Sequence, residues 1–218
     1  FTGSATEIGT FGDDTLTGTA NKDVLVGGTG DDTLIGGGGV DVLYGGAGDD
    51  VLAVSDLRLG RVDGGNGTDT LRLDGTGLRL DLTGLDNTSL LDIERIDLGN
   101  GNSLRLDALE LLRLSDSSNT LRVLGDGTDA VTLAGTSWIS AGQVTDTEGT
   151  FQVYTSGRAR IEILQGISVT GGPIAPVELS AVSLDADMRG FVINGVSLND
   201  YSGRSVSSAG DVNGDGLD

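Results

Sequence analysis

Gly27-Gly28-Thr29-Gly30-Asp31-Asp32-Thr33-Leu34-Ile35 (27–35) is the stretch that decides the fold, because it is one copy of a repeating nine-residue unit. Six copies share one register, with Asp at position 6 and Leu at position 8 of every copy. A fixed period of this kind is typical of repeat architectures, in which neighbouring units bury a shared core. The copies occupy residues 9–17, 18–26, 27–35, 36–44, 45–53 and 64–72.

Each copy predicts a tight turn followed by a short strand. Glycines at positions 1, 2 and 4 suit a turn that needs positive φ and close backbone approach. Position 6 adds a carboxylate to the carbonyls that such a turn exposes. In the strand, Leu at position 8 faces inward, while positions 7 and 9 face outward. A three-residue strand is not stable alone, so the copies must stack.

Stacking predicts where the position-6 aspartates meet. If two copies form one coil, copies n and n+2 lie on the same side, about 4.8 Å apart. Two carboxylates and several carbonyls then converge, and a calcium ion bound by six or more oxygens would relieve their repulsion. The expected pairs are Asp14 with Asp32, Asp23 with Asp41, Asp32 with Asp50 and, across the irregular stretch 54–63, Asp50 with Asp69. The alternative is a solenoid without metal, but Lys22 is the only basic residue before Arg58.

The copies resemble the GGxGxDxUx nonapeptides of the repeats-in-toxin (RTX) family over residues 9–53 and 64–72. The resemblance implies a right-handed parallel β-roll with several calcium ions in its turns. It also implies export from Gram-negative bacteria by type I secretion and folding in extracellular calcium. The copy at 18–26 departs most, because Thr19-Ala20-Asn21-Lys22 replaces the glycine turn, and Thr10 departs at position 2 of the first copy. We therefore expect the weakest site at 18–26.

The amino-acid composition restricts the classes of binding partner and of catalytic site that the chain can have. The chain has 218 residues with 33 acidic against 13 basic, a net charge of −20, and no His or Cys. That balance argues against nucleic acid and anionic membranes and favours hard cations. Ser-His-Asp, Cys-His and His-ligated zinc sites are impossible within the chain. Paired carboxylates could serve a glycosidase, but no carboxylate is set apart from the calcium motifs in a way that nominates it, so we expect no enzyme here. No apolar run approaches the roughly 20 residues of a membrane span. Asp92, Glu94 and Asp97, beside Arg95, are expected to be a solvated face flanking a strand.

The middle of the chain, 73–170, predicts a β-rich module. Leucines alternate with polar residues, as in half-buried strands. Residues 107–112 predict a helical turn capped by Asp107, and Trp138 and Tyr154 are expected in the core. The module either continues the roll as a less regular solenoid or folds as a separate sandwich. Beside 71–74 and 78–82, strands are expected at 104–106, 120–124, 130–133, 151–155 and 158–164.

The C-terminal region, 171–218, predicts a linker followed by a partial calcium-loop segment. Residues 171–176 hold both prolines. The segment that follows resembles an FG-GAP repeat, the blade unit of integrin-like β-propellers, and the resemblance makes Asp211, Asn213 and Asp215 calcium ligands. An ordinary Asp/Gly surface turn is the alternative. Because the chain lacks an initiator Met and stops within this motif, we expect a piece of a longer protein.

The predicted organisation is all-β: a calcium-binding roll at 1–72, the module at 73–170 and the segment at 171–218. The combination is similar to the tails of large bacterial surface adhesins. We expect a calcium-dependent structural or adhesive segment of a secreted or cell-surface protein. It is expected to assemble with its own copies through exposed edge strands or to meet a cell-surface or glycan partner. The alternatives are a secretion and folding module of an exoenzyme with its catalytic domain elsewhere, or the stalk of a ligand-binding propeller protein.

Overall fold

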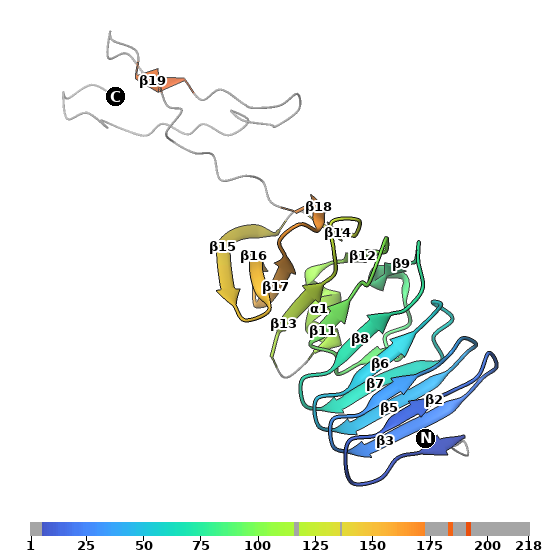
Figure 1. Cartoon of the computed structure of the whole chain (residues 1–218). Helices are drawn as coiled ribbons and strands as arrows, with labels where there is room; N and C mark the ends of the chain where they lie inside the picture. The colour runs from blue at the N-terminus through green and yellow to red at the C-terminus, as the bar shows by residue number, and fades with distance from the viewer. Residues whose placement is uncertain (1–5, 116–117, 136, 173–182, 185–190, 193–218) are drawn as a thin grey trace. The chain divides into compact units, whose positions relative to one another are not determined.

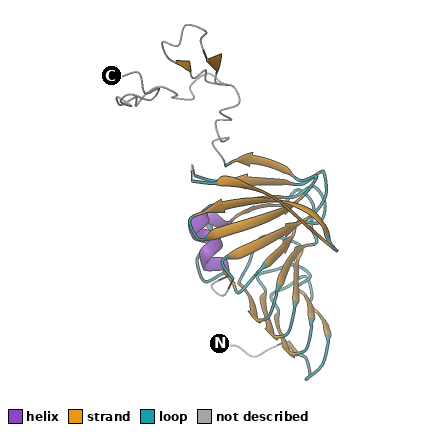
Figure 2. Ribbon diagram, turned by 90° about the vertical axis from the view of Figure 1, so that its left-hand side faces the viewer, coloured by secondary structure: helices purple, strands orange, loops and turns teal. Residues whose placement is uncertain are grey.

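The computed structural model describes residues 6–115, 118–135, 137–172, 183–184 and 191–192. Residues 1–175 form one compact unit, and residues 176–218 form a second. The first unit is a stack of coils whose strands build three sheets, almost all with parallel pairing (Figures 1 and 2). This is the all-β parallel roll that the repeats predict.

Two sheets enclose the repeat region. Sheet A has the order β1-β3-β5-β7-β10, and sheet B has the order β15-β16-β17-β13-β11-β8-β6-β4-β2. Sheet A contains β1 (Glu7–Ile8), β3 (Val24–Thr29), β5 (Val42–Ala47), β7 (Arg61–Asn66) and β10 (Leu90–Leu91). Sheet B contains β2 (Thr15–Thr17), β4 (Thr33–Ile35), β6 (Val51–Val54), β8 (Thr70–Leu73), β11 (Arg95–Asp97), β13 (Thr120–Leu124), β15 (Ile139–Asp146), β16 (Gly149–Ser156) and β17 (Ala159–Leu164).

Copies two apart pair in parallel, as the repeat period predicts. Leu34 of β4 lies beside Leu52 of β6, and Leu25 of β3 lies beside Leu43 of β5. Position 8 is therefore the inward position of both sheets. The six position-8 leucines are all buried, with exposed fractions of 6% at Leu16 and 0% at Leu25, Leu34, Leu43, Leu52 and Leu71.

The described residues from 74 to 171 continue the same solenoid and do not form a separate sandwich. Sheet B runs without a break from β2 through β8 and β11 to β17. The change in composition near residue 73 coincides with a third sheet, C, of order β18-β14-β12-β9, within the same compact unit. Its strands are β9 (Arg79–Asp81), β12 (Ser103–Leu106), β14 (Ala130–Leu133) and β18 (Ser168–Gly171).

The wider coils carry a 3-10 turn, η1 (Leu82–Gly84), and one helix, α1 (Ala108–Leu114), which packs against β10, β13 and β17. Asp107 caps α1 by accepting from the backbone amides of Leu109 and Glu110, as the sequence predicts. Trp138 is buried and Tyr154 packs against the core, also as predicted. The hairpin of β15 and β16, whose strands pair antiparallel, was not fully anticipated, since only 151–155 was expected as a strand.

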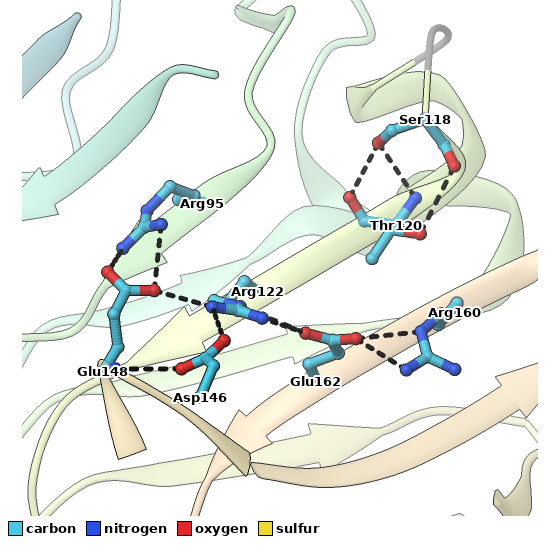
Figure 3. A network of polar contacts seen from close by, with 8 residues as sticks. All are labelled: Arg95, Ser118, Thr120, Arg122, Asp146, Glu148, Arg160 and Glu162. Atoms are coloured by element: carbon cyan, nitrogen blue, oxygen red, sulfur yellow. Dashed lines mark hydrogen bonds and ion pairs between the residues drawn. The ribbon is translucent and has the colours of Figure 1, made fainter. Parts of the chain in front are cut away.

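A chain of ion pairs on sheet B ties the β15–β16 turn to the parallel strands (Figure 3). Arg95, Arg122 and Glu162 are cross-strand neighbours on β11, β13 and β17. These arginines are thus engaged by carboxylates of the wider coils. The pairs are Arg122 with Asp146 (2.7 Å), Glu148 (2.6 Å) and Glu162 (2.7 Å), Arg160 with Glu162 (2.7 Å), and Arg95 with Glu148.

In the second unit, β19 (Ser183–Leu184) and β20 (Phe191–Val192) pair antiparallel. The acidic loop of the FG-GAP resemblance, with its expected ligands Asp211, Asn213 and Asp215, lies outside the described residues. The linker expected at 171–176 is described only to residue 172.

Candidate metal centre

The position-6 aspartates form hydrogen-bonded ladders between coils, in the pairs that the repeat predicts. In each pair, an Oδ1 atom accepts from the backbone amide of the position-6 aspartate one coil earlier. The stacking of these side chains is therefore fixed by the backbone itself. The contacts are Asp32 with Asp14 (2.8 Å), Asp41 with Asp23 (2.9 Å), Asp50 with Asp32 (2.8 Å) and Asp69 with Asp50 (2.8 Å).

The turns lie on two edges of the roll. We call the turns that precede sheet B, at 9–14, 27–32, 45–50 and 64–69, the acidic edge, and those that precede sheet A, at 18–23, 36–41 and 55–60, the opposite edge. Asp13, Asp31 and Asp49, at position 5, add a second ladder to the acidic edge. Oδ1 of Asp13 accepts from the amide of Asp31 at 2.9 Å, and Oδ1 of Asp31 from that of Asp49 at 2.8 Å. The Asp-Asp doublets in these copies were the sequence signal for this ladder.

Three carboxylate oxygens on the acidic edge have no hydrogen-bond partner. They are Oδ2 of Asp32, Asp50 and Asp69, and these residues are 1%, 0% and 0% exposed. Leaving a buried charged oxygen unpaired costs several kcal/mol, so such an atom calls for a cation. Residues 9–53 contain eight aspartates and one basic residue, Lys22, so these five copies supply far too little positive charge to neutralise their carboxylates.

Each unpartnered oxygen lies close to a carbonyl of the next coil. A Cβ placed on Gly45 would be 2.3 Å from Asp50 Oδ2 and 2.5 Å from the Gly64 carbonyl oxygen. A Cβ on Gly27 would be 2.4 Å from Asp32 Oδ2 and 2.6 Å from the Gly45 oxygen. The two oxygens of each set are thus within about 5 Å of each other, the span of two oxygens that share one calcium ion. The donor set fits calcium.

On the acidic edge, the residue at position 2 distinguishes Asp14 from the three unpartnered aspartates. Gly28, Gly46 and Gly65 have φ of +122°, +124° and +102°, which glycine adopts readily. Thr10 and Thr19 occupy position 2 in the first two copies, and each donates from its amide and hydroxyl to Oδ2 of its own position-6 aspartate. For Thr19 and Asp23 these distances are 2.6 and 2.9 Å. The departures at Thr10 and Thr19 therefore satisfy the carboxylates internally.

The opposite edge is neutralised differently. Asp23 is engaged by Thr19, and Asp56 in the irregular stretch pairs with Arg58 at 2.7 Å, close to Gly39 and Asp41. No carboxylate oxygen on the described opposite edge is both buried and unpartnered. The sequence treats six aspartates alike, whereas the structure separates three on one edge from the rest.

The expectation that Glu94 belongs to a solvated face is wrong. Glu94 is half-buried, its Oε2 accepts from the amide of Asp69 at 2.9 Å, and its Oε1 accepts from the Ser115 hydroxyl at 2.8 Å. It thus prolongs the aspartate ladder beyond the last nonapeptide. Asp97 accepts from the amide of Gly99, and Arg95 pairs with Glu148.

Burial shifts the titration of the acidic edge. Desolvation raises the pKa of Asp50 to about 6 and that of Asp69 to about 7, although the amides of Asp32 and Asp50 partly oppose the rise. Repulsion from neighbouring carboxylates adds to it. Near neutral pH, part of the buried charge is therefore removed by protons when no cation is bound.

In metal-free buffer, we expect the melting temperature to fall as pH rises from about 5 to about 8. The folded chain binds more protons than the unfolded chain between the ordinary aspartate pKa near 4 and the raised values of Asp50 and Asp69, so the free energy of unfolding decreases across that window. Saturating calcium should weaken or reverse the trend, because protons compete for the same oxygens. Thermal melts by circular dichroism, with and without calcium, would show this, and parallel pH profiles would contradict it.

Among the described residues, no three acidic side chains gather around one point. The candidate sites combine carboxylates with backbone carbonyls, so no acidic triad is needed. Nor does the described part of the chain contain a helix long and apolar enough to cross a membrane.

Stacked turns that bring buried carboxylate and carbonyl oxygens together on a parallel roll define a calcium-binding β-roll. A family model described as the RTX calcium-binding nonapeptide repeat (4 copies) matches residues 8–25 and 17–52. The chain therefore contains RTX repeats, which bind calcium and typically belong to secreted proteins. No match was found among curated proteins or solved structures.

Proposed function

We propose that this chain is a calcium-dependent structural segment of an extracellular adhesive protein, and that calcium on the acidic edge folds and stiffens the roll. The observation that carries the proposal is the row of buried, unpartnered oxygens of Asp32, Asp50 and Asp69. Asp14 and Asp23 would contribute less, because Thr10 and Thr19 donate to their Oδ2 atoms, and Asp41 would contribute less because it lies on the opposite edge. Extracellular calcium sites commonly have dissociation constants near 10⁻⁴–10⁻³ M, so the roll would be loaded outside the cell.

Calcium is expected to raise both the β-content and the melting temperature of the chain. Each filled site adds about 2.7 kcal/mol at a free calcium concentration about 100 times its dissociation constant, since the unfolded chain lacks the sites. Far-UV circular dichroism and thermal melts in calcium and in chelator would measure both effects. Magnesium at the same concentration is the control, because it prefers rigid octahedral geometry and retains water. An unchanged spectrum and melting point would remove the basis of the proposal.

The adhesive role rests on the solenoid form of the first unit. A solenoid stiffened by bound ions suits a spacer that presents binding surfaces. Exposed strands at the ends of the sheets offer edges for a second copy. Sedimentation of the chain with and without calcium tests self-assembly, and glycan-array binding tests a surface partner. Assemblies that persist in chelator would count against calcium-dependent contacts.

Two other proposals share the same calcium chemistry. A type I-secreted exoenzyme would use the roll as a folding module, and an integrin-like propeller would use it as a stalk, with Asp211, Asn213 and Asp215 as further ligands. Mutation of Asp211 and Asp215 to Asn tests the propeller-stalk proposal. On that proposal, the double variant should bind fewer calcium ions than the unmodified chain, while the melting temperature of the roll stays the same.

A further inference from the structure

The loop of residues 91–95 continues the acidic edge although it contains no nonapeptide. Ile96 of β11 lies beside Leu71 of β8, so Ile96 occupies the inward position that Leu holds in every copy. The amide of Arg95 donates to the Asp69 carbonyl at 3.0 Å, as the amide of Thr70 donates to the Asp50 carbonyl at 2.8 Å. Backbone pairing therefore places Glu94 at position 6 of this coil.

Glu94 makes the contact that defines position 6. Its Oε2 accepts from the Asp69 amide at 2.9 Å, as Oδ1 of Asp69 accepts from the Asp50 amide at 2.8 Å. The other oxygen, Oε1, accepts from the hydroxyl of buried Ser115, the residue that ends α1. The Glu94 carboxylate therefore lies beside Asp69 as the last member of the ladder.

One carboxylate oxygen of Asp69 has no hydrogen-bond partner and lies on the side of the 91–95 loop. This atom, Oδ2, is buried, and a Cβ on Gly64 would lie 2.5 Å from it and 2.1 Å from the Asp92 carbonyl oxygen. The corresponding distances at Gly45 are 2.3 Å to Asp50 Oδ2 and 2.5 Å to the Gly64 carbonyl. The same pair of oxygens therefore recurs one coil beyond the last nonapeptide.

Asp92 supplies that carbonyl through an unusual backbone. It is one of two described non-glycine residues with positive φ, at +49°. The left-handed conformation costs an aspartate about 1 kcal/mol or more. Leu91 of β10 lies beside Asp63 of β7, so the Asp92 carbonyl stands next to Gly64 as the Gly64 carbonyl stands next to Gly45.

We propose that the row of calcium sites extends one ion past the nonapeptides, to a site formed by Asp69 Oδ2 and the Asp92 carbonyl and supported by the Glu94 carboxylate. This inference rests on the calcium binding proposed for the repeats. Oxygen donors without nitrogen or sulfur select a hard divalent cation, namely calcium. Because Glu94 contacts Ser115 and the Ile93 amide donates to the Leu114 carbonyl, this ion would couple the repeats to α1 and the wider coils.

Isothermal titration with calcium as the only added metal would count the ions bound by the full chain. Asp69→Asn is expected to lower the count by about one ion, and Glu94→Gln to weaken one ion about 10- to 100-fold, as for other groups that orient ligands. Asp97→Asn is the matched control, because Asp97 is an acidic residue of the adjoining strand whose carboxylate accepts from the Gly99 amide, away from the ladder. It should titrate like the unmodified chain.

The outcomes separate this inference from the proposed function. If the unmodified chain binds no calcium, both fail. If Asp50→Asn removes an ion while Asp69→Asn and Glu94→Gln match the Asp97→Asn control, the repeats bind calcium and the added site is wrong. Circular dichroism in calcium checks that each variant is folded. If Asp69→Asn does not fold, Glu94→Gln still decides the question, because the amide oxygen of the new glutamine can accept from the Asp69 amide as Glu94 does.

Discussion

Replacement of Gly45 by alanine is expected to abolish most of the calcium-dependent gain in stability and to destabilise the metal-free roll. The new Cβ would lie 2.3 Å from Asp50 Oδ2 and 2.5 Å from the Gly64 carbonyl oxygen, far inside van der Waals contact. One methyl group thus fills the space between two proposed ligands. Overpacking of this kind costs typically 1–3 kcal/mol even without metal. The Gly64 carbonyl is backbone and the Asp50 side chain is buried, so there is little room to relax.

Gly12→Ala is the matched control for Gly45→Ala. Gly12 stands at position 4 of the first copy, and a Cβ there meets nothing within 4 Å. Thermal melts of both variants in calcium and in chelator give the comparison. Gly12→Ala should behave like the unmodified chain in both buffers. A Gly45→Ala variant with the full calcium-dependent rise in melting temperature would show that the ion does not lie between Asp50 and Gly64.

Much of the roll could be predicted from two positions of the repeat. Leu34 and Asp32 fix which face of the strand is inward and where carboxylates stack, because a strand alternates strictly and copies two apart must superpose. The pairing of Asp32 with Asp50 follows from the period alone, and the structure confirms it.

The division of the sites between two edges could not be predicted from position 6. Asp23 and Asp32 both occupy position 6 of their copies. The amide and hydroxyl of Thr19 donate to Asp23 Oδ2, whereas Asp32 Oδ2, in the copy with Gly28 at position 2, has no hydrogen-bond partner. The difference lies in a backbone φ that glycine adopts and threonine avoids. On the acidic edge, position 2 was the available signal, since Thr10 stands there in the first copy and glycine in the others. Position 2 does not separate the two edges, because the copy of Asp41 on the opposite edge has Gly37 there and Asp41 is not among the unpartnered aspartates.

The continuation beyond residue 73 was not predictable, because alternating leucines fit the inward face of a sandwich and of a solenoid equally well. Glu94 was missed for a related reason. The coil from Leu71 to Ile96 is longer than the repeat, so no fixed period aligns Glu94-Arg95-Ile96 with Asp69-Thr70-Leu71. Only the backbone pairing shows that an acidic residue again stands two positions before an inward aliphatic one.

The effect of Asp50→Asn on stability is expected to change sign with calcium. In metal-free buffer near neutral pH the variant should be more stable than the unmodified chain, by about 1–2 kcal/mol. The substitution removes a buried charge whose pKa burial raises to about 6, and the amide oxygen still accepts from the Asp32 amide. The amide nitrogen faces the region of the Gly64 carbonyl and can donate to it.

In calcium at about 100 times the dissociation constant, the same variant should melt about 1–7 °C below the unmodified chain. The lost site is worth about 2.7 kcal/mol, which exceeds the about 1–2 kcal/mol that the variant gains without metal, and each kcal/mol of the difference moves a domain of this size by about 2–4 °C. Asp14→Asn is the control. Asp14 Oδ2 already accepts from the amide and hydroxyl of Thr10, and an amide oxygen can replace it there, so both melts should change little. Destabilisation of Asp50→Asn by the same amount in both buffers would mean that Asp50 acts only through its hydrogen bond to Asp32. Stabilisation without calcium and destabilisation with it require a cation at Oδ2, since no contact within the chain reverses its effect when calcium is added.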